Sequence, residues 1–384
     1  MIELQTITII ISVVILLLAI VTPLINPFFR LPKALEEGRS TDENTVRKPI
    51  SIVIIAHDNA PELQKKLPVF LTQDYPADYE VIVVAEEKGS ETEDVIKQLS
   101  NEHKHLYATY LPDSSRYLSR KKLAITLGIK AAHHPWVIIT DAWCTPMNEN
   151  WLTAMANYCT DDKSLVLGYT QYGYEASANY HYEHIRTGIY NYKKAETGAA
   201  FGINSPLVAI RKELFMSRDG YRANLKFTRG EYDFLVNQYA DGQNTSLALQ
   251  PDAWLAEDTP YPKRWANKHL FAISSHHNME GNAKMTVLYQ IDMLMMHINN
   301  IACICGIIYG AMRHDWIVLA VASFALLLSF ILRALVASKA VRLFDLQFSS
   351  YAIPLLDYTL SLRNIGWRLR YFLADKNDFI THKL

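Results

Sequence analysis

The segment TDAWC, residues 140–144, places a single carboxylate, Asp141, at the end of the apolar run WVIIT. Carboxylate oxygens are preferred ligands of Mg²⁺ and Mn²⁺, and a second acid two residues later would complete a common cation site. Trp143 occupies that second position. The segment therefore indicates either a metal-assisted reaction centre that lacks half of its acids or a carboxylate that only caps a turn.

A second group of acids stands at Gly230-Glu231-Tyr232-Asp233. A reaction that removes a proton from a hydroxyl group needs a general base, and a carboxylate can take this role. Tyr232 is a poor base because the pKa of a tyrosine is about 10. If this segment supplies a base, Glu231 or Asp233 is the catalytic residue, although acids are also favoured in the first turn of any helix.

These side chains need a scaffold, and the pattern of residues 50–140 predicts one. Strands are expected at four runs, 51–57, 80–85, 106–112 and 136–140, and the first two read as buried parallel strands. Helical segments separate the runs, so we predict an α/β fold with a doubly wound, mostly parallel sheet. Ligands of such sheets bind beyond the carboxyl ends of the strands. In this chain those ends carry His57, Asp58, Asn59, Glu86, Glu87 and Asp141.

Three stretches without a charged residue predict transmembrane helices. Leu4 to Phe29 covers 26 positions, more than the roughly 20 that a helix needs to cross a bilayer. The other two stretches are Met293–Met312 and Trp316–Leu332, and Arg333 is expected to snorkel at the end of the last one. Basic residues follow the first span and the hairpin, which predicts that the large middle segment and the tail are cytoplasmic.

This pattern divides the chain into five predicted parts. An uncleaved N-terminal anchor (1–29) is followed by a polar linker (30–49) and an α/β domain (50–278). A transmembrane hairpin (285–337) then precedes a cytoplasmic tail (338–384), whose arginines suit a helix lying on an anionic membrane face.

Charge and composition exclude several classes of protein. The net charge of −1 argues against a nucleic-acid binder. A transporter is disfavoured because the spans carry few polar residues beyond Asp292 and His297. The four cysteines lack the pair spacing of a zinc site and are expected to be reduced.

Several blocks together resemble the family 2 glycosyltransferases, above all the membrane-anchored bacterial members, over roughly residues 49–275. The blocks are SIVIIAHDNAPELQKKLPVFLTQDYP, EVIVVAEE, SRKKLAITLGIKAAHHPWVIITDAWCTPMNENW, GINSPLVAIRKELF and GEYDFLVNQYADGQNTSLALQPDAWL. The resemblance implies a GT-A fold, a nucleotide-sugar donor, a divalent cation and an inverting mechanism. It also implies a bacterial inner (cytoplasmic) membrane location and a role in cell-envelope polysaccharide biosynthesis.

Donor-binding residues carry over position by position. Glu86, at the end of the second strand, matches the acid that holds the base of the nucleotide. Asn59 lies at the end of the first strand, and Lys122, or its neighbour Lys121, stands where a basic residue approaches the donor. Asp141 matches the first acid of an Asp-x-Asp motif, whose oxygens hold Mg²⁺ or Mn²⁺.

Three signature positions differ from the family pattern. Trp143 replaces the second metal acid, and Tyr232 replaces the usual base, with Glu231 and Asp233 on either side of it. The Gln-x-x-Arg-Trp motif has Tyr261 in the place of glutamine but keeps Arg264 and Trp265, with Lys268 close behind. We assign Arg264, Trp265 and Lys268 to donor binding, although Arg264 and Trp265 equally suit an anchor at the membrane surface.

Two functions follow from these residues. The first is a membrane-anchored, cation-assisted glycosyltransferase that takes a sugar from a nucleotide-sugar donor, with a UDP-sugar favoured, and passes it to a lipid-linked or polysaccharide acceptor. The second is a catalytically silent relative that serves as a scaffold or binding protein in a surface-polysaccharide pathway. The three departures discriminate between them, because all three affect the same chemistry.

Overall fold

The computed structural model describes residues 6–36, 47–57, 59–86, 90–112, 119–279, 281–346 and 348–374. Asp58, Glu87, half of the predicted linker (37–46) and the last ten residues lie outside this part of the chain. The chain forms two compact units. The first comprises Met1–Leu31, Ser177–Tyr190 and Gly281–Gly366, and the second comprises Pro32–Ala176, Asn191–Glu280 and Trp367–Leu384. Residues 177–190, which the sequence places in the α/β domain, thus belong to the unit of the long helices.

A seven-stranded sheet in the order β3-β2-β1-β4-β8-β6-β9 forms the second unit's centre. Its four parallel strands are those that the sequence predicts: β1 (Ile50–Ile55), β2 (Tyr79–Ala85), β3 (Leu106–Tyr110) and β4 (Trp136–Asp141). The remaining strands are β6 (Leu165–Gly168), β8 (Leu207–Arg211) and β9 (Thr245–Ala248), with β8 antiparallel to both of its neighbours. The predicted mostly parallel α/β sheet is confirmed.

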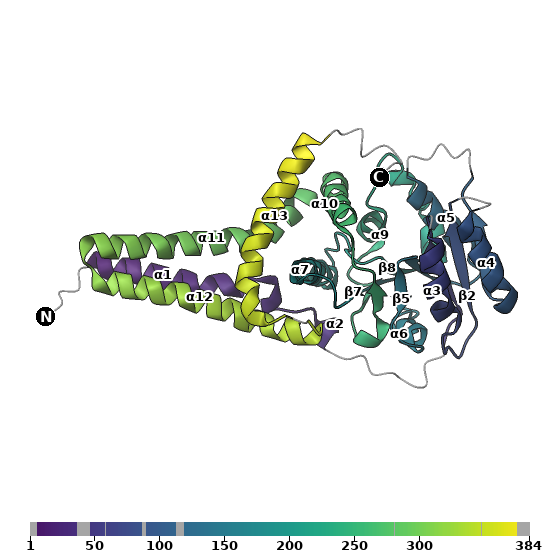
Figure 1. Cartoon of the computed structure of the whole chain (residues 1–384), viewed down its shortest axis with the longest axis horizontal. Helices are drawn as coiled ribbons and strands as arrows, with labels where there is room; N and C mark the ends of the chain where they lie inside the picture. The colour runs from purple at the N-terminus through teal and green to yellow at the C-terminus, as the bar shows by residue number, and fades with distance from the viewer. Residues whose placement is uncertain are drawn as a thin grey trace. The chain divides into compact units, whose positions relative to one another are not determined.

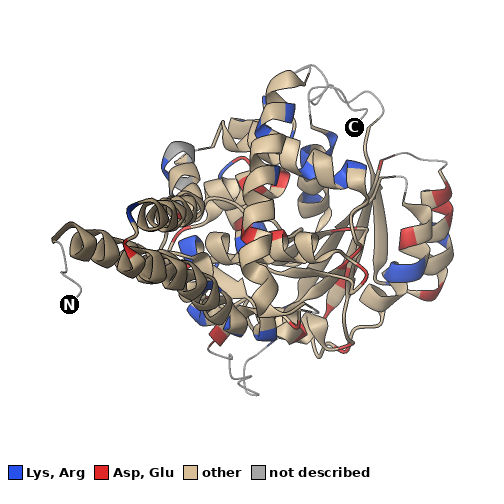
Figure 2. Ribbon diagram, turned by 60° about the vertical axis from the view of Figure 1, so that its left-hand side comes forward, with Lys and Arg blue, Asp and Glu red and all other residues tan. Residues whose placement is uncertain are grey.

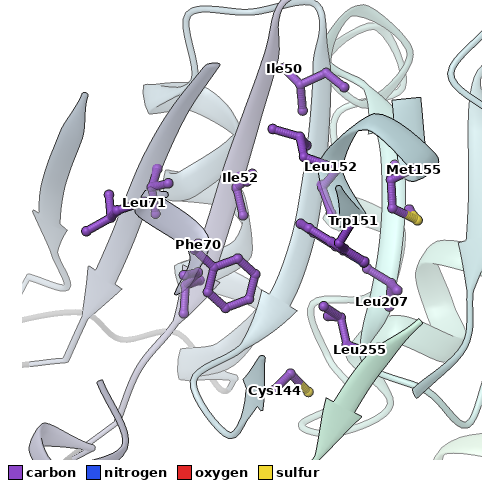
Figure 3. Packing of buried hydrophobic residues seen from close by; sticks show 14 of the residues in the cluster. Ile50, Ile52, Phe70, Leu71, Cys144, Trp151, Leu152, Met155, Leu207 and Leu255 are labelled. Atoms are coloured by element: carbon purple, nitrogen blue, oxygen red, sulfur yellow. The ribbon is translucent and has the colours of Figure 1, made fainter. Parts of the chain in front are cut away.

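Helices join the parallel strands, and β1, β2 and β4 are buried along nearly their whole length, which explains their nearly continuous runs of Ile and Val. At the edge of the sheet, β3 is exposed at Tyr107 and Ala108. These helices are α3 (Ala60–Leu71), α4 (Glu91–Glu102) and α5 (Arg120–Ala131). Figure 3 shows the core on one face, where Phe70 meets Trp151 edge to face at 5.6 Å between ring centroids. On α5, a Cβ at Gly128 would lie 2.3 Å from Val53 Cγ1, so glycine lets this helix lie close against β1.

A smaller sheet in the order β5-β10-β7 extends the second unit. Its strands are β5 (Cys144–Pro146), β7 (Thr170–Tyr172) and β10 (Leu255–Glu257), and Glu257 pairs with Cys144 beside Trp143. Two helices, α9 (Glu231–Tyr239) and α10 (Pro262–His276), follow late in this unit. The shorter elements are α2 (Lys33–Glu36), α6 (Trp151–Ala156), α8 (Lys212–Ser217), η2 (Arg222–Asn224) and η3 (Pro251–Ala253).

In the first unit, α1 (Thr6–Leu24), α11 (Asn282–Arg313) and α12 (Trp316–Leu343) lie side by side (Figure 1). Three segments are long and apolar enough to cross a membrane, Thr6–Leu24, Tyr289–Arg313 and Trp316–Leu343, as the sequence predicts. Figure 2 shows these helices almost free of charged residues. The unit also contains η1 (Pro27–Phe29), η4 (Ser350–Ala352), most of α13 (Ile353–Leu373) and the start of α7 (Ala178–Glu196).

A buried ion cluster, Arg186, Asp292, Arg333 and Asp357, joins four helices of the first unit. Arg333 donates to Asp292 at 2.8 Å and to Asp357 at 2.7 Å, and Arg186 pairs with Asp292 at 3.0 Å. All four side chains are at most 3% exposed. The predicted snorkelling of Arg333 is therefore wrong, because two carboxylates supply inside the protein the partners that a snorkelling arginine seeks in water.

Candidate functional site

Asp141 lies at the carboxyl edge of the main sheet, where β4 ends level with Ile55 of β1. Its side chain is buried and both of its oxygens have partners. Oδ2 accepts a hydrogen bond from the ammonium of Lys121 at 2.7 Å, and Oδ1 accepts one from the hydroxyl of Tyr232 at 3.0 Å. The residue is therefore the point at which the start of α5 and the start of α9 meet the end of β4.

Two aromatic rings complete the surroundings of the Lys121 ammonium. Its Nζ lies 5.0 Å from the centroid of the Trp143 ring and 4.9 Å from that of Tyr232. Rings at this distance attract a cation through their negative faces. The guanidinium of Arg264 lies 4.0 Å from the same indole and 3.4 Å from Oε1 of Glu257. We call Lys121, Asp141, Trp143 and Tyr232 the lysine cage.

The first turn of α9 is set by Gly230, which has a left-handed φ of 82°. A Cβ there would also lie 2.5 Å from Cβ of Ser275 on α10, so both backbone and space require glycine. This turn directs Tyr232 to Asp141. Burial, and then the charge of Asp141, raise the pKa of Tyr232 well above its ordinary value. The phenol is therefore a neutral hydrogen-bond donor and not a base.

The two predicted catalytic acids have different surroundings. Glu231 is 9% exposed, and its Oε1 accepts a hydrogen bond from Ser119 Oγ at 3.2 Å. Asp233 accepts from the backbone N–H of Ile203 at 2.9 Å through Oδ1, and its Oδ2 lies 3.1 Å from Nε2 of His276. His276 is a partner that spacing along the chain did not reveal.

Lys122, the lysine that the sequence assigns to the donor, is 1% exposed. Its ammonium donates to the carbonyl oxygens of Asn224 at 2.9 Å and Phe227 at 2.5 Å. Burial lowers its pKa to about 8, against an opposing effect of the Glu231 charge. These contacts are those of a structural residue that fixes the segment before α9, and its neighbour Lys121 contacts Asp141 instead.

The acid at the end of β2 also has basic partners. Glu86 forms ion pairs with Arg120 and with His57, and Arg120 Nη2 also donates to the Glu86 carbonyl at 3.4 Å. Asn59, which precedes α3, accepts from the backbone N–H of His57 at 2.8 Å. His57 thus contacts both Glu86 and Asn59, so the two predicted residues lie near each other at the carboxyl edge of the sheet.

The remaining predicted donor residues lie on α10. Trp265 is 5% exposed and meets Tyr172 edge to face at 6.3 Å between ring centroids. Lys268 donates to the hydroxyl of Tyr172 at 2.8 Å and to the carbonyl of Asn204 at 3.1 Å. Burial of the Trp265 ring does not fit the alternative of an anchor at a membrane surface.

The residues around Asp141 do not fit a divalent cation. Such an ion prefers several oxygen ligands, and no group of three or more His, Cys, Asp or Glu residues with metal-site geometry occurs in the described part of the chain. Both oxygens of Asp141 are engaged, one of them by a lysine ammonium that would repel a second cation. We therefore derive no step through a metal.

The model of glycosyl transferase family 21 matches residues 9–207, more than half of the chain. Among solved structures, the mannosyltransferase PcManGT from Pyrobaculum calidifontis, in complex with GDP-Man and Mn²⁺, has a TM-score of 0.58 at 16% identity. The similarity covers 94% of this chain and 98% of that one, and it supports the GT-A-like fold. The three candidate membrane spans come from the length and composition of this chain's own helices.

TarS from S. aureus, residues 1–349 in complex with UDP-GlcNAc, has a TM-score of 0.46 at 11% identity. That similarity covers 82% of this chain and 92% of that one. No curated protein sequence matches the chain.

Proposed function

Because the chain belongs to glycosyl transferase family 21, we propose that this glycosyltransferase takes its sugar from a nucleotide-sugar donor and works at a membrane. The resemblance to family 2 in particular stays a prediction. One observation carries the proposal. A cation, Lys121, is held by Asp141 at the carboxyl edge of a doubly wound sheet, where such sheets bind their ligands. A positive group at this edge suits the diphosphate of a nucleotide sugar.

The predicted donor residues border the same edge. Glu86, with Asn59 nearby, would face the nucleoside, as the sequence implies. Arg264, stacked on Trp143, would approach the phosphates, and Lys268 lies one helical turn beyond it on α10. A UDP-sugar stays the favoured donor from the sequence, whereas the Pyrobaculum mannosyltransferase is in complex with GDP-Man. Both contain the nucleoside diphosphate that these groups would recognise.

We infer that Asp233 is the general base. A base must pass its proton onward, and Asp233 contacts His276, whose side chain is 34% exposed. Glu231 is held inside by Ser119 and adjoins the Lys122 charge, so it suits a structural role. Gly202 supports the assignment, because a Cβ there would lie 2.4 Å from Oδ1 of Asp233. Glycine at position 202 therefore leaves space for the Asp233 carboxylate, which any larger residue would displace.

The reaction that follows is a single displacement. The acceptor hydroxyl oxygen attacks the anomeric carbon as its proton passes to Asp233. The bond between that carbon and the phosphate oxygen breaks, and its electron pair leaves with the nucleoside diphosphate. Attack from the opposite side inverts the anomeric centre. The leaving diphosphate would be stabilised by two cations, Lys121, which Asp141 holds, and Arg264, which lies over the Trp143 ring.

The three apolar helices favour an acceptor that is itself in or at the membrane, such as a lipid-linked sugar or a growing surface polysaccharide. The cytoplasmic orientation and the bacterial inner membrane stay predictions. The sequence predicts a divalent cation at Asp141, and the Pyrobaculum mannosyltransferase is in complex with Mn²⁺, but the ligand set around Asp141 disfavours such an ion here.

Calorimetry on the detergent-solubilised full chain tests the proposal. The protein is titrated with a panel of UDP- and GDP-sugars, and mass spectrometry detects transfer to a lipid extract. Binding of one donor, together with a product heavier by one sugar, is expected. Binding without turnover would favour the catalytically silent scaffold, and no binding of any donor would reject the proposed function.

A further inference from the structure

Charge balance decides which cation the lysine cage is built to hold. A divalent ion needs carboxylate oxygens that are free to coordinate it beside the phosphates of the substrate, whereas an ammonium is neutralised by one carboxylate. Here both oxygens of the carboxylate are already engaged, one by Lys121 and one by Tyr232. The cage contains one carboxylate, Asp141, and two uncharged rings. Its electrostatics therefore match a cation of charge one, and Lys121 is that cation.

The same balance explains why two signature positions depart together. Trp143 stands at the place of a second metal acid and Tyr232 at the place of the usual base. Each presents a ring to the Lys121 ammonium, at 5.0 Å and 4.9 Å from the ring centroids. Tyr232 in addition donates to the carboxylate oxygen that Lys121 leaves open, at 3.0 Å. The departures are thus parts of one cation site and not separate losses.

Lys121 also has the exposure that contact with a ligand requires. Its side chain is 25% exposed, whereas Asp141 beneath it is 2% exposed. Among the described residues Asp141 is its hydrogen-bond acceptor, and an ammonium has three N–H groups to donate. Arg264 adds a second cation on the Trp143 indole, and its side chain is 24% exposed.

We propose that the Lys121 ammonium replaces the divalent cation and binds the diphosphate of the donor directly, with Arg264 as its companion. This inference rests on the proposed function, because it names the group that neutralises the leaving diphosphate. Asp141 then holds and orients the lysine instead of binding a metal. Diphosphate binding and sugar transfer accordingly proceed without a divalent ion.

The test uses UDP and GDP as probes of diphosphate binding. The solubilised full chain is titrated with each nucleotide in EDTA and again with Mn²⁺. We expect equal dissociation constants in the two conditions. Binding that requires Mn²⁺ overturns the inference and leaves the proposed function standing. Absence of binding to either nucleotide, and to every nucleotide sugar, in both conditions rejects the proposed function itself.

Variants of Lys121 test its role directly. Lys121→Met is expected to weaken diphosphate binding by roughly 10- to 100-fold, the loss of one hydrogen bond between charged groups. Lys121→Arg keeps the charge and should remain within about tenfold of the wild type. Lys130→Met, at the exposed end of the same helix, is the matched control and should bind as the wild type does. Unchanged binding by Lys121→Met overturns the inference.

A converse variant guards against a simple folding defect. Lys121→Met combined with Trp143→Asp removes the ammonium and supplies a second carboxylate two residues from Asp141. This double variant should bind UDP or GDP in Mn²⁺ and lose that binding in EDTA. Recovery of metal-dependent binding shows a folded site whose cation has been exchanged. A double variant that binds equally well in EDTA contradicts the role of Lys121.

Discussion

The hydroxyl of Tyr232 donates a hydrogen bond to Oδ1 of Asp141 over 3.0 Å and so fastens the first turn of α9 to the end of β4. The two residues are 91 positions apart in the chain. This bond ties α9, which carries both candidate acids, to β4, whose Asp141 holds the ammonium of Lys121. A substrate contact at the acids of α9 would therefore be coupled to a contact at the lysine cage.

Tyr232→Phe removes this bond and leaves a buried carboxylate oxygen without a donor. We expect a loss of about 1–3 kcal/mol in the free energy of unfolding, measured by thermal or chemical denaturation. Because the folded pKa of Tyr232 is raised, its contribution is complete below pH 10 and is lost as the pH rises further. The difference between wild type and variant should therefore narrow above about pH 10. A difference that stays constant from pH 8 to 11 would contradict the raised pKa.

Lys122 gives a pH dependence of the opposite sign. Its pKa falls from 10.5 to about 8 on folding, so between these values the unfolded chain binds the proton and the folded protein does not. The wild type should gain stability across this interval by roughly 3 kcal/mol relative to Lys122→Met, which has no group to titrate. Denaturation at pH 7.5 and 10 measures the change. Parallel curves for the two proteins would refute the shift.

Asp233→Asn should lower kcat by about 10²- to 10⁴-fold, because an amide cannot accept the acceptor's proton. The dissociation constant of the donor should not change, since the substitution preserves shape and leaves the lysine cage intact. Glu231→Gln is the matched control, and its main effect is expected on stability. If Glu231→Gln abolishes turnover and Asp233→Asn does not, the two roles are reversed.

The buried ion cluster makes a stability prediction. Asp357→Asn leaves Arg333 facing one carboxylate instead of two, inside the protein. We expect the free energy of unfolding to fall by about 3–5 kcal/mol, which is detected as a lower melting temperature of the solubilised chain. The double variant Asp357→Leu with Arg333→Met removes both charges and should be less destabilised than the single variant. Additive losses would show that these two residues are not coupled.

The parallel strands and the position of Asp141 were predictable because apolar runs and their polar ends are local signals. Partners across long separations were not. Lys121 and Asp141 are 20 residues apart and Asp141 and Tyr232 are 91 apart, and only the register of β4 and the left-handed turn at Gly230 bring them together. A helix start also does not reveal which of two adjacent lysines turns inward, so Lys122 was preferred to Lys121. The partners of Arg333 are not predictable for a similar reason, since they lie on two other helices, Asp292 on α11 and Asp357 on α13.

The buried ion cluster also sets an order of maturation. Its members leave the ribosome as Arg186, Asp292, Arg333 and finally Asp357. Until α13 is synthesised, the two guanidinium groups of the cluster, on Arg186 and Arg333, share the single carboxylate of Asp292. A chain that stops short of Asp357 thus holds one positive charge that nothing in the cluster neutralises. Asp357, on α13, completes the balance, so the cluster carries no net charge once this helix is in place.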